Sequence, residues 1–204
     1  MTPERPEATQ VALLVIEALT ALGVRYHLGG SYASSVHGIP RQTQDIDLVA
    51  ALTPDTAAAL VRRLAAQFYA DEESARDAAR ARRSFNLVHL DSGIKVDLFV
   101  LGDSSFDREE FEYAVPITDD QGNVVVVKSA EHTILRKLLW YRAGGEVSER
   151  QWADVVGIVD AQGDRLNIDL LRRWGRELEI EDLLARALGP SASSGQLRRR
   201  HIER

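Results

Sequence analysis

The chain has 204 residues, of which 45% are hydrophobic, and a formal net charge of −6. This length and apolar content suit one globular domain with a helical extension and exclude a disordered chain. The absence of cysteine excludes disulfides, thiolate chemistry and cysteine-based zinc sites. No signal peptide stands out and no apolar run is long enough to span a membrane, so we expect a cytoplasmic protein without membrane contact.

Residues 1–128 are expected to form a mixed α/β domain. Helices are predicted where apolar residues recur at helical spacing, and strands where apolar runs lie between turn residues. In chain order the expected elements are a helix over 8–22, a strand over 24–28, a short helix over 32–37 with Ser31 as its N-cap, a strand over 45–52, helices over 54–69 and 71–83, a β-hairpin over 84–101 and a smaller hairpin over 114–128.

Helices dominate after residue 128. Apolar spacing predicts four of them, at about 130–142, 148–160, 167–177 and 181–188. Residues 190–204 are expected to be a flexible basic tail. The predicted fold is therefore an α/β (α+β) domain over 1–128, in which helices flank a mixed sheet, followed by a small helical unit over 129–189.

Three acidic residues interrupt the apolar strands. Asp45 and Asp47 are two positions apart in one predicted strand, so both side chains point to the same face. Asp97 is a lone acid in a later strand, on the face opposite to Val96 and Leu98. Carboxylates at close range repel each other, and a divalent cation removes that repulsion. Oxygen ligands without histidine or cysteine suit Mg²⁺ or Mn²⁺.

A phosphate-binding turn is expected beside these acids, because Mg²⁺ held by few carboxylates completes its shell with water and phosphate oxygens. Gly29 and Gly30 let the backbone approach a phosphate closely, and Ser31 adds a hydroxyl at a helix start. Arg41 precedes the acids and offers a bidentate guanidinium. Taken singly, these features are also typical of an ordinary turn or a solvated strand face. Their order along the chain favours a site for a nucleoside triphosphate and its metal ions.

The segment LGGSYASSVHGIPRQTQDIDL, followed by KVDLFV, resembles the minimal nucleotidyltransferase signature of the DNA polymerase β superfamily. Within that superfamily, the pattern GGSxA…RxTxDIDL is similar to the AbiEii/MenT-type nucleotidyltransferases. These include toxin subunits of toxin–antitoxin and abortive-infection systems. The resemblance covers about residues 24–101 and implies the nucleotidyltransferase fold, an NTP substrate and an antitoxin protein as a partner. The larger toxins of the family have longer helical C-terminal halves than this chain.

The resemblance also implies a lysine on a downstream helix and an aspartate on the next helix. Lys137 in EHTILRKLLWYR and Asp154 in SERQWADVVGIV match these positions. Lys137 is expected to bind the nucleotide by neutralising charge on its triphosphate. Asp154 lies off the apolar stripe of its helix and is expected to face the cleft. A solvated helix surface is the alternative for both residues.

These residues predict a metal-dependent nucleotidyltransferase that moves an NMP from an NTP to a hydroxyl acceptor. Asp45, Asp47 and Asp97 are the expected ligands of two metal ions, and Asp97 is also expected to orient or deprotonate the acceptor. By resemblance, a tRNA 3′ end is one acceptor. AMP transfer to a protein or small-molecule hydroxyl, and a non-catalytic nucleotide-binding module, are the alternatives. The acidic chain favours the smaller acceptors, although arginine tracts occur at 62–63, 76–83 and 198–200.

Overall fold

The computed structural model of the chain describes residues 7–40, 45–118 and 122–189. Its elements, in chain order, are α1 (Glu7–Ala21), β1 (Tyr26–Leu28), α2 (Gly30–His37), β2 (Ile46–Ala50), α3 (Pro54–Leu64), β3 (Phe68–Tyr69), α4 (Glu72–Arg80), β4 (Ser84–His89), β5 (Lys95–Val100), α5 (Ser105–Glu112), β6 (Val115–Thr118), β7 (Val124–Val127), α6 (Ala130–Ala143), α7 (Glu149–Gln162), the 3₁₀ turn η1 (Gly163–Arg165), α8 (Ile168–Glu177) and α9 (Glu181–Leu188). No helix in this part of the chain is both long and apolar enough to cross a membrane.

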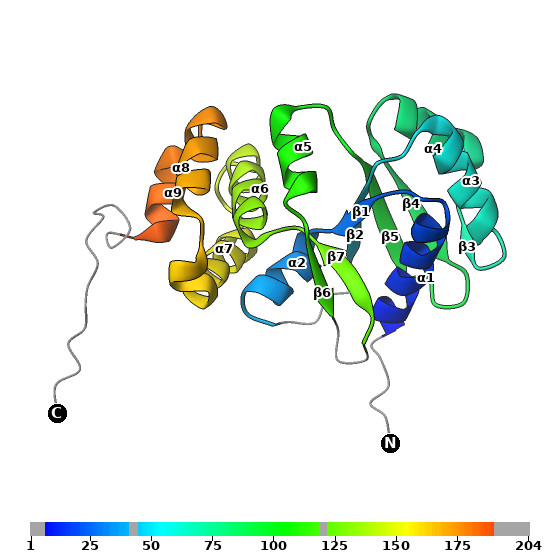
Figure 1. Cartoon of the computed structure of the whole chain (residues 1–204), viewed down its shortest axis with the longest axis horizontal. Helices are drawn as coiled ribbons and strands as arrows, with labels where there is room; N and C mark the ends of the chain where they lie inside the picture. Colours follow the sequence, from blue (N-terminus) through cyan, green and yellow to red (C-terminus); the bar gives the residue numbers. More distant parts are fainter. Residues whose placement is uncertain (1–6, 41–44, 119–121, 190–204) are drawn as a thin grey trace, which may run out of the picture.

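In the described residues, seven strands form one mixed sheet in the order β3-β4-β5-β2-β1-β7-β6. The pairs β2–β5 and β1–β7 are parallel, and the other neighbouring pairs are antiparallel. One face of the central strands packs against α1, α3 and α4, which lie to the right in Figure 1. The mixed sheet flanked by helices was expected from the sequence and is confirmed.

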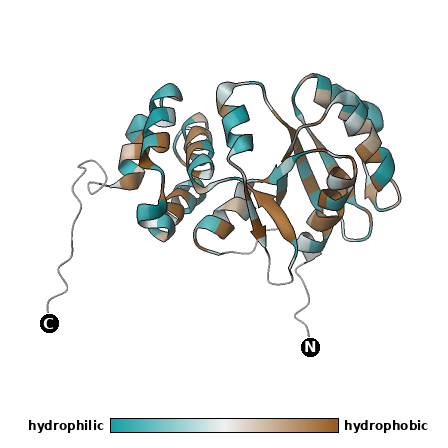
Figure 2. Ribbon diagram, in the orientation of Figure 1, coloured by the Kyte–Doolittle hydropathy of each residue, from teal (hydrophilic) through white to brown (hydrophobic). Residues whose placement is uncertain are grey.

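The apolar core has two parts. The first joins the sheet to α1, α3 and α4, and Figure 2 shows hydrophobic residues along the strands. The second joins Phe106 of α5 to α6, α7, α8 and α9, which lie together at the left of Figure 1. The expected division of the chain into two domains at residue 128 stays a prediction. Phe106, which precedes this position in the chain, packs among the C-terminal helices. The expected tail over 190–204 lies outside the described residues.

Most predicted elements form within a few residues of their expected bounds, but two local predictions are wrong. Ser31 is not the N-cap of α2: the helix begins at Gly30, whose φ of +51° a glycine adopts readily, and Gly29 takes the N-cap position. The helix after Thr53 ends at Leu64 rather than near residue 69, because Phe68 is buried in the core and pairs with His89 as part of β3.

Helix α5 was not predicted at all. It has few apolar residues, and its charged side chains face the C-terminal helices. A signal was present, since Ser104 and Asp107 form a capping box at its start. The helix matters for the site described below, because it carries Glu110, a buried acid that pairs with the buried Lys128 and the partly buried Arg136.

His132 makes the stability of the C-terminal helices sensitive to pH. The residue is fully buried, and its Nδ1 lies 2.8 Å from the Ser129 hydroxyl. Burial lowers the pKa of His132 from 6.5 to about 4, and Lys128 adds to this effect, although nearby Glu110 and Glu109 oppose it. Between these two values the unfolded chain binds a proton that the folded chain does not.

We therefore expect the free energy of unfolding to fall as the pH decreases from about 6.5 towards 4, by up to about 1.4 kcal/mol per pH unit from this residue. Urea denaturation of the wild type and of His132→Gln across this range measures the effect. The variant should show a shallower pH dependence, because the other histidines contribute equally to both proteins. Parallel curves for the two proteins would contradict the assignment.

Candidate active site

Two strand carboxylates lie side by side on the face of the sheet opposite to α1, α3 and α4. Asp47 of β2 and Asp97 of β5 are direct partners in the parallel register. Their neighbours Ile46, Leu48 and Leu98 point into the core and are buried. Because side chains alternate along a strand, both acids point away from that core. Asp47 and Asp97 therefore lie on one face of the sheet, and Asp45, which was expected to lie in the same strand as Asp47, comes just before β2.

The charges of these acids act on one another. Asp47 is half-buried, and its pKa is raised by burial and by the neighbouring carboxylates of Asp97 and Asp45. Lys128 and Lys137 act in the opposite direction and lower the pKa of Asp47. Four charged groups, from the residue before β2, from β5, from α6 and from the segment after β7, thus lie within electrostatic range of the Asp47 carboxylate.

The glycine turn packs directly on Asp47. The Gly29 N–H donates a hydrogen bond of 2.8 Å to the Asp47 carbonyl oxygen. At Gly30, an added Cβ would overlap the Asp47 carboxylate, so a glycine is required there for space as well as for its positive φ. The start of α2 therefore lies against the carboxylate, which places the N-terminal end of a helix, a favourable position for phosphate oxygens, beside the acids.

An arginine from the C-terminal helices reaches this turn. The Arg150 guanidinium, at the start of α7, donates a hydrogen bond of 3.0 Å to the Ser31 hydroxyl and lies 3.9 Å from the Asp45 carboxylate. Sequence reasoning missed this residue because 119 positions separate it from Ser31. The available signal was its spacing: Arg150 is one helical turn before Asp154, on the same side of α7. Arg41, the arginine expected to bind phosphate, lies outside the described residues.

Lys137 and Asp154 form a buried ion pair between α6 and α7. Their Nζ and Oδ2 atoms are 2.8 Å apart, and both side chains are nearly inaccessible to solvent. Neither residue is part of a solvated helix surface, the alternative considered for them. The charge of Lys137 also lowers the pKa of Asp47, so the pair lies within electrostatic range of that carboxylate.

A second buried lysine lies behind the glycine turn. Lys128 approaches Gly29 so closely that its Nζ would be 3.7 Å from a Cβ added there. Its Nζ is 3.0 Å from Glu110 of α5, and Arg136 donates to the other Glu110 oxygen at 2.9 Å. Burial alone would raise the pKa of Glu110, but Lys128, His27 and Arg136 together hold it well below its usual range. Lys128 was not predicted, because it looked like the polar end of an apolar strand.

Two of the three acids, Asp97 and Asp45, lie next to cationic side chains of the same chain. Lys95 lies 2.9 Å from Asp97, and the hydrogen bond with Asp97 raises the pKa of Lys95. Arg150 lies beside Asp45. In the described ranges, no three histidine, aspartate or glutamate side chains are gathered closely enough to hold a metal ion. The donor set nevertheless fits Mg²⁺ or Mn²⁺, because Asp47 and Asp97 present hard oxygens on one face and the charge of Asp97 raises the pKa of Asp47.

A mixed sheet with paired strand acids beside a Gly-Gly-Ser helix start is the arrangement expected of a nucleotidyltransferase. Residues 16–194 match the family model described as "Nucleotidyl transferase AbiEii toxin, Type IV TA system". The chain therefore belongs to the AbiEii family of nucleotidyltransferases, which are toxins of type IV toxin–antitoxin systems. The family resemblance seen in the sequence is confirmed, and with it the assignment of the protein as an enzyme that uses NTP.

One solved structure supports the fold at low sequence identity, and a second is similar to a lesser degree. The solution structure of the antibiotic-resistance factor ANT(2″)-Ia is 16% identical, with a TM-score of 0.50, and the match covers 89% of this chain and 98% of that one. An antigenic nucleotidyltransferase-like protein from Paracoccidioides brasiliensis is 18% identical, with a TM-score of 0.49, over 89% of this chain and 91% of that one. No curated protein sequence matches the chain. At these identities the likeness concerns the fold alone.

The contact between Gly30 and Asp47 can be tested with a matched pair of substitutions. Gly30 and Gly93 both have positive φ, but nothing lies within 4 Å of a Cβ added at Gly93. Gly93→Ala should therefore lose only about 1–2 kcal/mol of unfolding free energy, the cost of the left-handed conformation. Gly30→Ala should lose more, because it also displaces the Asp47 carboxylate. Urea denaturation compares the two, and equal losses would mean that the turn moves away from Asp47 without cost.

Proposed function

We propose that this protein transfers an NMP from an NTP to a hydroxyl acceptor with the help of two Mg²⁺ or Mn²⁺ ions. The observation that carries the proposal is the direct register pairing of Asp47 with Asp97 on a face against which the Gly29-Gly30 turn packs. Bound at Asp45, Asp47 and Asp97, such ions would lower the pKa of the acceptor hydroxyl and stabilise the departing pyrophosphate. Asp45, which lies next to β2, would complete the ligand set.

The remaining residues have roles in holding the nucleotide. Backbone N–H groups at Gly30 and Ser31 would bind the β- and γ-phosphates at the start of α2, while the Gly29 N–H holds the turn against β2 through its bond to the Asp47 carbonyl. The Arg150 guanidinium, already on the Ser31 hydroxyl, is placed to contact the same phosphates. Arg41 is proposed as a further phosphate contact.

Lys137 and Asp154 are proposed to act as a unit. Lys137 would neutralise charge on the triphosphate, and Asp154 fixes its ammonium through the 2.8 Å ion pair. This pairing gives Asp154 a positioning role, because its carboxylate already has a cationic partner.

In the transfer step, the acceptor oxygen bonds to the α-phosphorus while the bond to the bridging oxygen of pyrophosphate breaks. The hydroxyl proton passes to the Asp97 carboxylate. In-line displacement places the leaving group and the acceptor on opposite sides of the α-phosphorus. Because the glycine turn follows β1, on one side of β2, the acceptor should approach from the β5 side, next to Asp97.

The first acceptor we propose is a tRNA 3′ end, by analogy with related toxins, and the proposed protein partner is an antitoxin. A protein or small-molecule hydroxyl is the second candidate, and one observation favours it. The arginine tracts near α4 do not form a free basic patch, because Arg62 and Arg76 pair with Glu72 and Arg80 pairs with Asp77. We propose that the protein acts in the cytoplasm, where an NTP and a tRNA acceptor would be at hand.

A labelled-NTP assay tests the proposal. Purified protein, Mg²⁺ or Mn²⁺ and each of four α-labelled NTPs would be incubated with total bacterial tRNA, with lysate protein and with hydroxylated small molecules. The double variant Asp45→Ala/Asp47→Ala is the control. Label on one acceptor class that is absent with the control establishes transfer and its acceptor. NTP binding without label on any acceptor would favour a non-catalytic nucleotide-binding module instead.

Asp97→Asn separates catalysis from nucleotide binding. Asparagine keeps the shape but cannot accept the acceptor proton, so we expect kcat to fall about 10²-fold or more while the Kd for NTP changes by only a few-fold. Single-turnover transfer and equilibrium NTP binding measure the two quantities. Asp91→Asn, in the exposed hairpin turn, is the matched control. A variant that loses binding but keeps the rate of bound nucleotide would show that Asp97 belongs to the nucleotide site instead.

Arg150→Ala should weaken binding of the triphosphate. Loss of a charge-assisted contact to phosphate predicts a Kd for NTP about 10-fold or more higher, with a smaller effect on the Kd for the nucleoside monophosphate. The control is Arg63→Ala, which removes an exposed arginine from α3. Equal weakening for mono- and triphosphate would place Arg150 away from the β- and γ-phosphates.

A further inference from the structure

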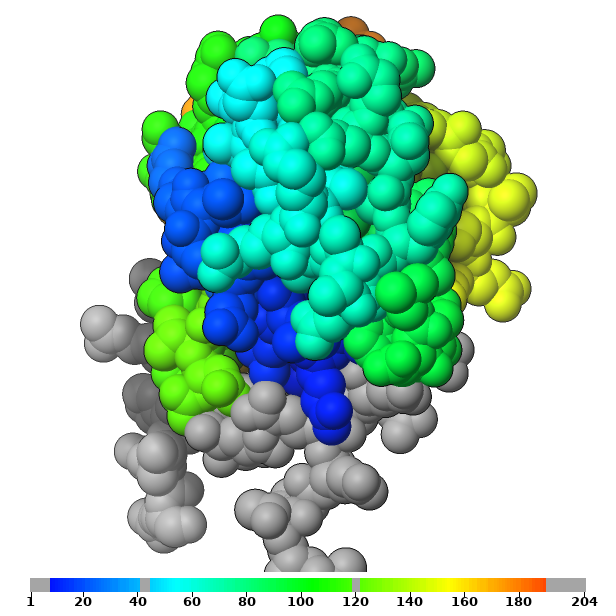
Figure 3. Space-filling model, turned by 90° about the vertical axis from the view of Figure 1, so that its right-hand side faces the viewer, coloured from blue at the N-terminus to red at the C-terminus, as the bar shows by residue number. Residues whose placement is uncertain are grey.

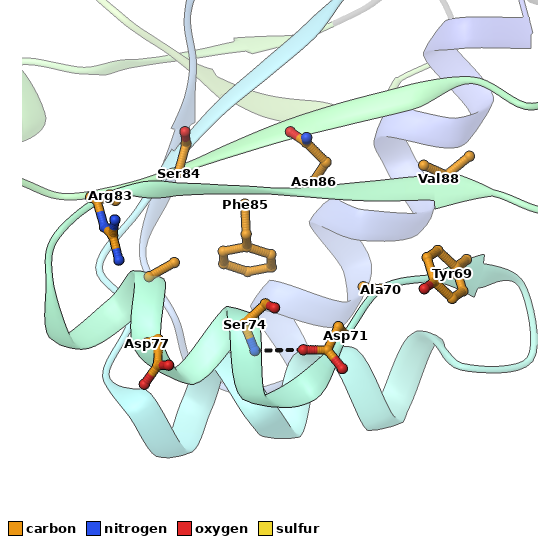
Figure 4. Close-up of a pocket in the computed structure, with 11 residues that line it drawn as sticks. Tyr69, Ala70, Asp71, Ser74, Asp77, Arg83, Ser84, Phe85, Asn86 and Val88 are labelled. Carbon is orange, nitrogen blue, oxygen red and sulfur yellow. Dashed lines mark hydrogen bonds between the residues drawn. The ribbon is translucent and has the colours of Figure 1, made fainter.

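A groove lies at the edge of the sheet, away from the C-terminal helices. Its volume is about 890 Å³, and β4 and α4 form its walls. The polar residues along it include Tyr69, Asp71, Ser74, Asp77, Ser84 and Asn86, shown in Figure 4. In Figure 3 the side of the molecule built by α3 and α4 faces the reader. None of the proposed nucleotide-binding residues lines this groove.

The groove exists because β3 covers only half of the β4 edge. The two residues of β3 pair with His89 and Val88 of β4, and the chain then turns away into α4. In the described part of the chain, no other strand pairs with this edge. The first half of β4, from Ser84 to Leu87, therefore has an open side that faces the groove.

The hydrogen-bonding phase of β4 shows which backbone groups are exposed there. His89 donates to Ile94 and Val100 donates to Arg83, so residues 83, 85, 87 and 89 bond to β5. The N–H and C=O groups of Ser84 and Asn86 consequently point outward into the groove. No hydrogen bond to either residue from this side is present among the described residues.

The opposite edge of the sheet is protected, but this one is not. Strand β6 contains Pro116, a residue that cannot donate a hydrogen bond to an added strand. The open half of β4 has the sequence SFNL, with no proline and no lysine. Open edges of this kind are the surfaces to which extended peptide segments add as a further strand.

The charges in the groove indicate the chemistry of the segment. Two carboxylates line the groove, Asp71 at the N-cap of α4 and Asp77 within it, together with one arginine, Arg83. Asp77 also pairs with Arg80 at 2.7 Å, so a basic segment would share that carboxylate with Arg80. Hydrogen bonds with Ser74 keep the pKa of Asp71 low, so its carboxylate stays ionised. Phe85 points towards α4 and belongs to the buried core, whereas Tyr69 lies exposed at the end of the groove and offers an aromatic surface there (Figure 4). A segment with lysine or arginine on the side facing α4 is complementary to these groups.

We propose that the β4 edge binds an extended segment of a partner protein, which pairs with the backbone of Ser84 and Asn86 and places basic side chains over Asp71 and Asp77. In a strand, alternate side chains point to opposite faces. The basic residues would therefore face α4, and the residues between them would lie beside the Asn86 side chain on the other face. This docking site is separate from the nucleotide site and does not depend on the proposed function.

The test uses a fluorescein-labelled peptide, TKVKVKT, and fluorescence anisotropy with the full chain. TEVEVET, with reversed charge, is the first control. Two further peptides carry N-methyl groups on alternate residues, one on the odd and one on the even positions. Because only alternate N–H groups of a strand face its neighbour, strand pairing predicts that one methylated peptide binds like the parent and the other binds at least 10-fold more weakly.

Variants of the protein locate the site. Asp71→Asn/Asp77→Asn should weaken TKVKVKT binding at least 10-fold and keep the α4 cap, since asparagine caps as well as aspartate. Asp164→Asn/Asp169→Asn removes the same charge elsewhere and should change nothing. Asn86→Pro should abolish binding, because its outward N–H is lost, while Asn86→Ala should bind normally. NTP binding in the same samples should stay unchanged, which separates this proposal from the proposed function.

Three results would overturn the proposal. The first is no binding of TKVKVKT up to about 1 mM, an affinity weaker than about −4 kcal/mol. The second is equal binding of both methylated peptides, which would mean attraction by charge alone. The third is a wild-type dimer, seen by analytical ultracentrifugation, that becomes a monomer in Asn86→Pro, because the edge would then be occupied by a second copy of the chain.

Discussion

The site depends on one constraint, the partial burial of the Asp47 carboxylate between a neighbouring acid and a helix start. Asp97 lies opposite in the sheet, and the Gly30 backbone leaves no room for a side chain between the helix and the carboxylate. Repulsion and burial both raise the pKa of Asp47. Lys128 and Lys137 offset this cost, and each is itself buried and held by an acid. The charge of Asp47 thus couples β2 and β5, the glycine turn and the helices that hold Lys137 and the partner of Lys128.

The buried ion pairs are better understood as positioning devices than as sources of stability. Taking two charges out of water costs about as much as their attraction returns, although breaking such a pair is costly. Lys137–Asp154 joins α6 to α7, and Lys128–Glu110 joins the glycine turn to α5. Gly38, at the end of α2, lies close to Ile158 of α7, and a side chain at this position would crowd the contact between the two helices. The result is that α7 presents Arg150 to Ser31 across the two halves of the protein.

The two edges of the sheet show how local sequence controls access. Pro116 protects β6, whereas β4 is half-covered by a two-residue strand and keeps outward backbone groups over an acidic groove. This open edge lies one strand from Asp97, since Asn86 is the register partner of that acid. Nucleotide chemistry and partner binding would thus occupy neighbouring but separate surfaces of one sheet.

The sequence by itself determined which strands contain Asp47 and Asp97, where the glycine turn lies, where the four C-terminal helices form, and the family. These features are local: period-two and period-3.6 spacing and turn residues act within a few positions. Only the tertiary structure decided that Asp97 pairs with Asp47, that Lys137 is buried on Asp154, and that Arg150 and Lys128 reach the glycine turn. Strand register and helix packing bring together residues as far as 119 positions apart, and no local pattern encodes such contacts. The same reason explains why α3 ended early, because burial of Phe68 against β4 outweighed its helical spacing.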